Sequence, residues 1–214
     1  KLYPNYKVSY VLQEKPEGPA HALWLTRDLI KQGDKVLINF CDTLLEHDMS
    51  FLKNLDPQYD GLIFVKEVED YRRFGVVVAE DNIMKLIVEK PDQPVSKLAN
   101  IGTYFFQDGY DLMQSLQKMI DKDLKVKGEY YLPEAFMLMI YEQKKIFVQE
   151  VDEWLDTGKI ETILDTHKRI LKGENIQGEN VTLEDTKLEG NVAIAKNSTL
   201  KNCNIKDSII CENT

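Results

Sequence analysis

Between residues 20 and 171 the chain alternates short apolar runs with longer amphipathic segments, and this alternation limits the folds that it can adopt. Apolar runs typical of strands lie at residues 36–40, 61–68, 99–106 and 146–151. Segments with apolar residues at helical spacing lie at residues 20–32, 108–122, 132–143 and 159–171. Strands that alternate with helices predict an α/β layered sheet.

Three further elements are predicted in this part of the chain. Residues 7–12 alternate polar and apolar side chains, which predicts a short strand, and residues 49–55 predict a short helix. The apolar runs at 74–78 and 83–88 flank the turn-forming pair Asp81-Asn82. Two strands joined by such a pair predict a β-hairpin.

The pattern changes after Gly173, where helical spacing ends and apolar residues recur every six positions, as at Leu188, Ile194 and Leu200. A hexapeptide repeat predicts the turns of a parallel β-helix. We therefore predict a first domain at residues 1–173 and the start of a left-handed parallel β-helix at 174–214.

The register of this repeat is imperfect, because Leu183, Ile205 and Ile209 fall outside the main series. An unstructured polar tail is therefore the alternative interpretation. So short a solenoid would need further turns, a cap or another subunit to cover its last turn. We expect a homo-oligomer.

Charge and composition exclude several classes of function. The net charge of −9 comes from 36 acidic and 27 basic residues, which argues against a nucleic acid partner, since nucleic acid phosphates need a basic surface. No apolar stretch approaches the ~20 residues of a membrane span, and the first residues show no secretion signal. The three cysteines form no paired framework, so we expect reduced thiols and a cytoplasmic protein.

Two aspartates, Asp42 and Asp156, each stand where an apolar run breaks into a polar turn, and Glu89-Lys90-Pro91 ends a third such run. In α/β sheets, ligands bind outside the carboxyl ends of strands. Mg²⁺ prefers one or two carboxylates together with phosphate oxygens, while a lysine can neutralise a second phosphate. This group of residues indicates a Mg²⁺-assisted reaction at phosphate, although each aspartate taken alone also fits an ordinary turn residue.

Several short motifs occur in a fixed order along the chain. They are VLQEKPEGPAHA at 11–22, Asp42, FGVV at 74–77, EKP at 89–91, ANIG at 99–102 and WLDTG at 154–158. In this order they resemble the sugar-1-phosphate nucleotidyltransferases, which include the glucose-1-phosphate thymidylyltransferases and uridylyltransferases. The resemblance covers about residues 8–171 and implies a Rossmann-like mixed sheet flanked by helices.

The resemblance implies a reaction in which dTTP or UTP and a sugar 1-phosphate, most often glucose 1-phosphate, give a nucleotide sugar and pyrophosphate. It implies that Asp42 and Asp156 hold Mg²⁺, and that Lys90 binds the phosphate of the sugar 1-phosphate. Glu89, Gly75 and Asn100 would face the sugar. Sugar hydroxyls suit a carboxylate, which accepts hydrogen bonds from them with fixed geometry.

The same resemblance gives Gln13 and Gly18 the role of binding the base. The Gln13 amide offers a donor and an acceptor to the imide edge of uracil or thymine, and Gly18 lets the backbone approach the base. A solvated amide and a simple turn glycine are the alternatives. Trp154 fits either the core or the wall of a pocket.

Two departures from the family pattern affect the expected activity. The residue before the first aspartate is usually glycine in this family and is Cys41 here, where a side chain would crowd the nucleotide. The family also opens with a Gly-rich loop that holds the triphosphate, and no Gly-Gly or Gly-x-Gly occurs in this sequence. We therefore expect these 214 residues by themselves to lack turnover.

Two rival functions remain open. A non-catalytic regulatory subunit that binds a nucleotide sugar is favoured by Cys41 and by the lack of the Gly-rich loop, but not by the retention of both aspartates. An acyltransferase in the C-terminal turns would need a histidine there, and none follows His167.

Overall fold

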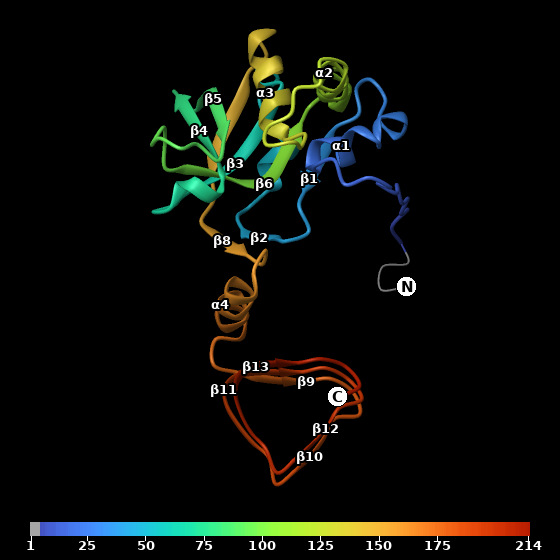
Figure 1. Ribbon diagram of the computed structural model, residues 1–214, viewed down its shortest axis with the longest axis vertical. Helices are drawn as coiled ribbons and strands as arrows, with labels where there is room; N and C mark the ends of the chain where they lie inside the picture. Colours follow the sequence, from blue (N-terminus) through green and yellow to red (C-terminus); the bar gives the residue numbers. More distant parts are fainter. Residues whose placement is uncertain (1–4) are drawn as a thin grey trace. The chain divides into compact units, whose positions relative to one another are not determined.

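The computed structural model describes residues 5–214, which divide into two compact units (Figure 1). The first unit contains the chain up to Phe40 together with Glu46–Glu153. The second unit contains Cys41–Leu45 and Trp154–Thr214. None of the helices in the described part of the chain is long and apolar enough to cross a membrane.

The first unit is built on a mixed six-stranded sheet with the order β1-β6-β3-β7-β5-β4. Its strands are β1 (Val36–Asn39), β3 (Gly61–Glu67), β4 (Gly75–Glu80), β5 (Ile83–Glu89), β6 (Leu98–Phe106) and β7 (Ile146–Glu150). Strand β3 pairs in parallel with β7 and antiparallel with β6, which also pairs antiparallel with β1. The predicted mixed α/β sheet flanked by helices is confirmed.

The predicted hairpin is also confirmed, with Gly75 opposite Glu89 and Val77 opposite Ile87. Asp81 and Asn82 form its turn and both have positive φ angles, of 50° and 60°. A two-residue turn with two positive φ angles matches the right-handed twist of the strands, and Asp and Asn tolerate this backbone well.

The described residues of the first unit form three α-helices, namely α1 (Pro19–Trp24), α2 (Gly109–Asp121) and α3 (Leu132–Tyr141). The predicted helix at residues 20–32 is shorter than expected, because it ends at Trp24 and continues as the 3-10 turn Arg27–Leu29. The short helix expected at residues 49–55 is a 3-10 helix, Ser50–Asn54. A third 3-10 helix spans Tyr71–Arg73.

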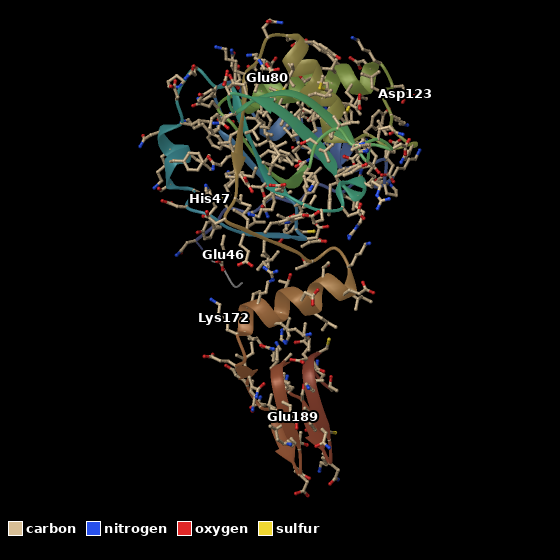
Figure 2. All side chains as sticks on the ribbon, turned by 90° about the vertical axis from the view of Figure 1, so that its left-hand side faces the viewer. Glu46, His47, Glu80, Asp123, Lys172 and Glu189 are labelled. Atoms are coloured by element: carbon tan, nitrogen blue, oxygen red, sulfur yellow. The ribbon has the colours of Figure 1, made fainter. Side chains whose placement is uncertain are left out.

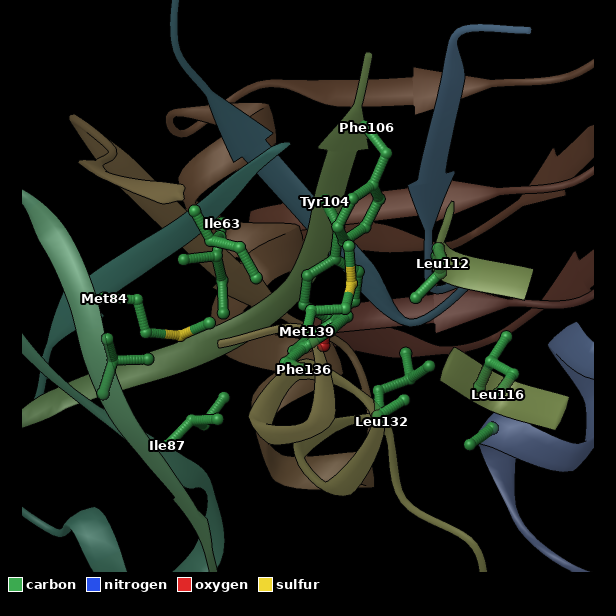
Figure 3. Close-up of a cluster of buried hydrophobic side chains, with 14 of the residues drawn as sticks. Ile63, Met84, Ile87, Tyr104, Phe106, Leu112, Leu116, Leu132, Phe136 and Met139 are labelled. Carbon is green, nitrogen blue, oxygen red and sulfur yellow. The ribbon is translucent and has the colours of Figure 1, made fainter. Parts of the chain in front are cut away.

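The core of the first unit lies between one face of the sheet and helices α2 and α3 (Figure 3). The Phe136 ring of α3 lies 5.0 Å from the ring of Tyr104 and 5.7 Å from that of Phe106. Phe64 belongs to the opposite face of β3, where its ring contacts Phe51 and His47. Strand β3 is therefore covered on both faces, as its continuous apolar run requires.

The strand predicted at residues 7–12 is wrong, because these residues form no strand in the structure. Their alternation does not reflect a buried face, since Val8, Tyr10 and Leu12 are 60%, 93% and 78% exposed. Residues 1–4 of the predicted first domain lie outside the described residues.

The second unit contains most of a separate two-stranded sheet, in which β2 (Thr43–Glu46) pairs with β8 (Glu153–Asp156). Helix α4 (Ile160–Leu171) follows, and it ends at Lys172, whose left-handed backbone has a φ of 52° (Figure 2). Gly173 continues this turn with a φ of 91°. Helix α4 therefore ends next to the glycine that the sequence marks as its stop.

Residues 175–214, here called the coil segment, contain five short strands. They are β9 (Asn175–Gln177), β10 (Thr182–Glu184), β11 (Lys187–Ile194), β12 (Thr199–Lys201) and β13 (Asn204–Ile210). All their pairings are parallel, with Leu183 opposite Leu200 and Leu188 opposite Ile205, each 17 positions apart. Leu183 and Ile205, which break the six-residue series, therefore pack against the small core of Val192, Ile194 and Leu200.

Candidate functional site

Asp42 and Asp156 converge in the second unit although they are far apart in sequence. Asp42 directly precedes β2 and Asp156 is the last residue of β8, so the pairing of these strands brings the two residues together. The Thr157 N–H donates to the Asp42 carbonyl at 2.9 Å, and the Gly158 N–H donates to Asp156 Oδ1 at 2.8 Å. The sequence placed Asp156 at the edge of an α/β sheet, but its strand belongs to the small two-stranded sheet.

Gly158 shows how close the two carboxylates lie. A β-carbon on Gly158 would be 3.1 Å from Asp156 Oδ1 and 3.2 Å from Asp42 Oδ2. Asp42 is exposed and Asp156 is half-buried, so neither carboxylate points into a dry interior. Helix α4 supports this arrangement, because the Thr166 hydroxyl donates to the Asp156 carbonyl at 3.1 Å.

The Asp42 and Asp156 carboxylates suit Mg²⁺, which needs few protein ligands, better than a metal ion whose ligands all come from the protein. No cluster of three or more His, Cys, Asp and Glu side chains that could hold a metal occurs within residues 5–214. Mg²⁺ commonly takes one or two carboxylates and fills its other positions with water and substrate phosphates. Two neighbouring, accessible carboxylates therefore fit the ion that the sequence predicts.

A second group of predicted residues comes together in the first unit around the end of the hairpin. Gly75 opens β4 directly opposite Glu89, the last residue of β5. A β-carbon on Gly75 would lie 2.9 Å from Glu89 Oε2 and 3.6 Å from Asn100 Nδ2. Any side chain at position 75 would therefore displace the Glu89 carboxylate.

Lys90 follows β5 in a left-handed backbone conformation, with a φ of 46°. Its N–H donates to the Phe74 carbonyl at 3.0 Å, which holds the turn against the start of the hairpin. The Lys90 Nζ lies 3.5 Å from Glu89 Oε1 and donates to the Tyr131 hydroxyl at 3.3 Å. Lysine rarely adopts positive φ, so the surrounding contacts must hold this conformation.

Burial and the neighbouring groups shift the pKa values of both Glu89 and Lys90. Burial raises the pKa of the Glu89 carboxyl, and the nearby Lys90 ammonium offsets only part of that effect. Burial lowers the pKa of Lys90, but the Tyr131 hydroxyl and the Glu89 charge outweigh it and leave the pKa raised. Lys90 therefore keeps its positive charge, while burial makes the charged form of the neighbouring Glu89 carboxyl less favourable.

Asn100 is fixed by hydrogen bonds within its own strand. Its Nδ2 donates to the Tyr104 hydroxyl at 2.7 Å, and its Oδ1 accepts from the Gly102 N–H at 3.0 Å. Tyr104 is 1% exposed, and burial raises the pKa of its hydroxyl. Asn100 is therefore held rigidly beside Gly75, and whether it faces a sugar stays a prediction.

Gln13 and Gly18 also meet, through a hydrogen bond from Gln13 Nε2 to the Gly18 carbonyl at 3.1 Å. The same nitrogen lies 3.0 Å from His21 Nδ1. Gly18 has a φ of 109°, and a β-carbon there would lie 2.5 Å from the Tyr130 carbonyl oxygen. The fold thus requires glycine at position 18 whether or not a base binds there.

Sequence reasoning missed Tyr131, which contacts Lys90 from 41 positions away. Its position just before helix α3, which has a proline in its first turn, predicts only a helix start. Cys41, which the sequence suggested would crowd a nucleotide, has an exposed side chain.

Comparisons with known proteins indicate the family of the chain. Residues 3–173 match the family model for nucleotidyl transferases. The chain is 26% identical over 197 residues to the low-salt glycan biosynthesis nucleotidyltransferase Agl11 of Haloferax volcanii, covering 90% of this chain and 53% of that protein. It is 24% identical over 205 residues to a glucose-1-phosphate thymidylyltransferase of Streptomyces griseus, covering 93% of this chain and 56% of that protein.

Among solved structures, apo UDP-glucose pyrophosphorylase is similar, with a TM-score of 0.62 and 25% identity over 77% of this chain and 63% of that one. The chain spans about half the length of the two curated relatives.

Proposed function

The chain belongs to the nucleotidyl transferase family, and on that premise we propose that it serves to transfer a nucleotidyl group from dTTP or UTP to a sugar 1-phosphate, although these 214 residues by themselves should lack turnover. Glucose 1-phosphate is the proposed acceptor, and the products are a nucleotide sugar and pyrophosphate. The observation that supports the proposal most is the convergence of Asp42 and Asp156 beside Gly158. Two anionic reactants approach each other only where cations offset their repulsion.

Asp42 and Asp156 would hold Mg²⁺, which when bound would neutralise phosphate charge. The Lys90 ammonium would bind the phosphate of the sugar 1-phosphate as a point charge. The Glu89 carboxylate would accept hydrogen bonds from sugar hydroxyls, and the absence of a side chain at Gly75 lets this carboxylate keep its position. Gln13 and Gly18 would contact the imide edge of the base.

The matched test replaces each aspartate by asparagine. We expect Asp42→Asn and Asp156→Asn each to weaken the Mg²⁺-dependent binding of UTP or dTTP by about tenfold or more, because even groups that only orient metal ligands contribute that much. Calorimetric titrations with Mg²⁺ and with EDTA measure the effect without requiring turnover.

Asp185→Asn is the control, because Asp185 is exposed in the coil segment and its left-handed backbone, with a φ of 44°, suits asparagine. The same Mg²⁺ dependence in the parent chain and in both aspartate variants would contradict the proposed metal site.

We also propose that the coil segment is the start of a left-handed parallel β-helix and that it mediates a homo-oligomer. The parallel pairings support the first part, because they relate successive stretches of chain by 16 or 17 positions, as at Ile194 with Ile210 and Ile194 with Gln177. Support for the second part comes from the face formed by β9, β11 and β13. There Ile176, Ala193 and Ile209 lie side by side, and the two isoleucines are 52% and 43% exposed.

A further inference from the structure

The contacts of Tyr131 suggest a role that goes beyond the residues named so far. Lys90 is the proposed phosphate ligand, yet its side chain is 37% exposed and has a flexible four-carbon stem. A lysine of this kind normally samples many rotamers, and binding must then order it at an entropic cost. A neighbour that restricts the Lys90 ammonium before the phosphate arrives would reduce that cost.

Tyr131 contacts the Lys90 ammonium in two independent ways. The Lys90 Nζ lies 3.3 Å from the Tyr131 hydroxyl oxygen and 4.8 Å from the centre of the Tyr131 ring. The ring contact is within the range of a cation–π interaction, and the hydroxyl accepts one of the three ammonium protons. Glu89 Oε1, at 3.5 Å, is the other partner of the ammonium, so one of its three donors is left for a phosphate.

The backbones of Lys90 and Tyr131 are both held in place, so the fold itself brings their side chains into contact. Lys90 is held in its left-handed turn by Phe74, and Tyr131 directly precedes helix α3. Helix α3 packs against the hairpin through Pro133, whose Cγ would lie 3.5 Å from a β-carbon on Gly75. The elements that carry Tyr131 and Lys90 therefore touch at a second point.

We propose that Tyr131 is a positioning residue that holds the Lys90 ammonium ready for the phosphate of a sugar 1-phosphate. This inference rests on the proposed function and extends it. Tyr131 itself does not need to touch the reacting atoms. Its ring and its hydroxyl contribute separately, so two substitutions can distinguish them.

The test measures binding of α-D-glucose 1-phosphate and of methyl α-D-glucoside, which lacks the phosphate, by titrations followed in NMR spectra of the full chain. Tyr131→Leu removes both contacts and should weaken glucose 1-phosphate binding about tenfold, whereas Tyr131→Phe keeps the ring and should weaken it about threefold. Binding of methyl α-D-glucoside should not change. In a Lys90→Met background, Tyr131→Leu should have no further effect.

Tyr141→Leu is the matched control, because Tyr141 ends the same helix and is 72% exposed. It should leave both ligands unaffected.

The outcomes separate this inference from the function on which it rests. If Lys90→Met weakens glucose 1-phosphate binding and Tyr131→Leu does not, the positioning role is wrong and the function stands. If Tyr131→Leu has the same effect with and without Lys90, Tyr131 acts through the fold and the inference is again wrong. If the parent chain binds glucose 1-phosphate no better than methyl α-D-glucoside, the inference and the proposed function are both wrong. The same holds if Lys90→Met leaves the binding of glucose 1-phosphate unchanged.

Discussion

At the scale of single residues, Glu89 shows how the proposed sugar site opposes stability. Its side chain is 10% exposed, and burial raises its pKa although Lys90 lies beside it. The folded chain therefore binds the Glu89 proton more tightly than the unfolded chain does. The contribution of Glu89 to stability is most favourable below the ordinary carboxyl pKa, and it declines as the pH rises through the raised folded-state pKa.

We expect Glu89→Gln to be more stable than the parent chain at neutral pH, because the amide carries no charge that burial penalises. The difference should shrink as the pH falls below the ordinary carboxyl range, where Glu89 is protonated in both states. Urea denaturation at a series of pH values measures this. A variant that is less stable at neutral pH would mean that the Lys90 ion pair outweighs burial.

At the scale of elements, the segment before α1 is joined to the segment before α3 through Gly18 and Tyr130. The Ala20 N–H donates to the Tyr130 carbonyl at 3.0 Å, and the Tyr130 N–H donates to the Glu17 carbonyl at 2.8 Å. A β-carbon at Gly18 would lie 2.5 Å and 2.7 Å from the backbone oxygen and nitrogen of Tyr130. Backbone atoms tied by two hydrogen bonds cannot move aside cheaply.

Gly18→Ala should therefore lower the free energy of unfolding by about 3 kcal/mol, since it combines a positive φ with a backbone clash. Gly33→Ala is the matched control: Gly33 also has a positive φ, of 83°, but nothing lies within 4 Å of its β-carbon position. It should cost about 1 kcal/mol, the strain alone. Equal losses in the two variants would show that the contact with Tyr130 contributes nothing.

The elements that the sequence predicted best are those whose pattern is local. The hairpin at Asp81-Asn82 and the buried strand β3 follow from turn residues and apolar runs that lie next to each other in the chain. Strands β2 and β8 were missed because each has only two apolar residues, Leu44-Leu45 and Trp154-Leu155, between polar ones. The strand expected at residues 7–12 failed because alternation records burial only where a second layer covers the segment.

The candidate site also has a part that the sequence predicts locally and a part that depends on the fold. Asp42, Lys90 and Asp156 stand in short motifs, and their residue types alone suggest a metal and a phosphate. The meeting of Asp42 with Asp156 beside Gly158, and of Lys90 with Tyr131, depends on strand pairing and helix packing that no local pattern encodes.

At the scale of the whole molecule, the coil segment has two faces of different chemistry, and one of them carries the proposed self-association. Its outward residues on β10 and β12 are polar, and Lys201 forms an ion pair with Glu184 at 2.8 Å. The face of β9, β11 and β13 differs, because Ile176 and Ile209 are exposed there on either side of Ala193. Exposed apolar residues grouped on one face are typical of an interface.

If this face joins copies of the chain, the double substitution Ile176→Lys and Ile209→Lys should convert the oligomer to a monomer, because two buried like charges would meet no partner. Sedimentation velocity measures the mass of the full chain. Thr182→Lys with Thr199→Lys is the control, since these exposed residues lie opposite each other on β10 and β12 and add the same charge. A double isoleucine variant with the mass of an oligomeric parent, or a parent that is already a monomer, would contradict the proposal.

The placement of the two tryptophans gives each compact unit its own fluorophore. Trp24 stacks on His21, the neighbour of Gln13, while Trp154 is two positions before Asp156 in β8. A variant that keeps only Trp24 would emit light from the neighbourhood proposed for the base, and one that keeps only Trp154 would emit from the neighbourhood of the acidic pair. Binding at the proposed base site and binding at the proposed metal site could thus be followed separately in solution without any attached dye.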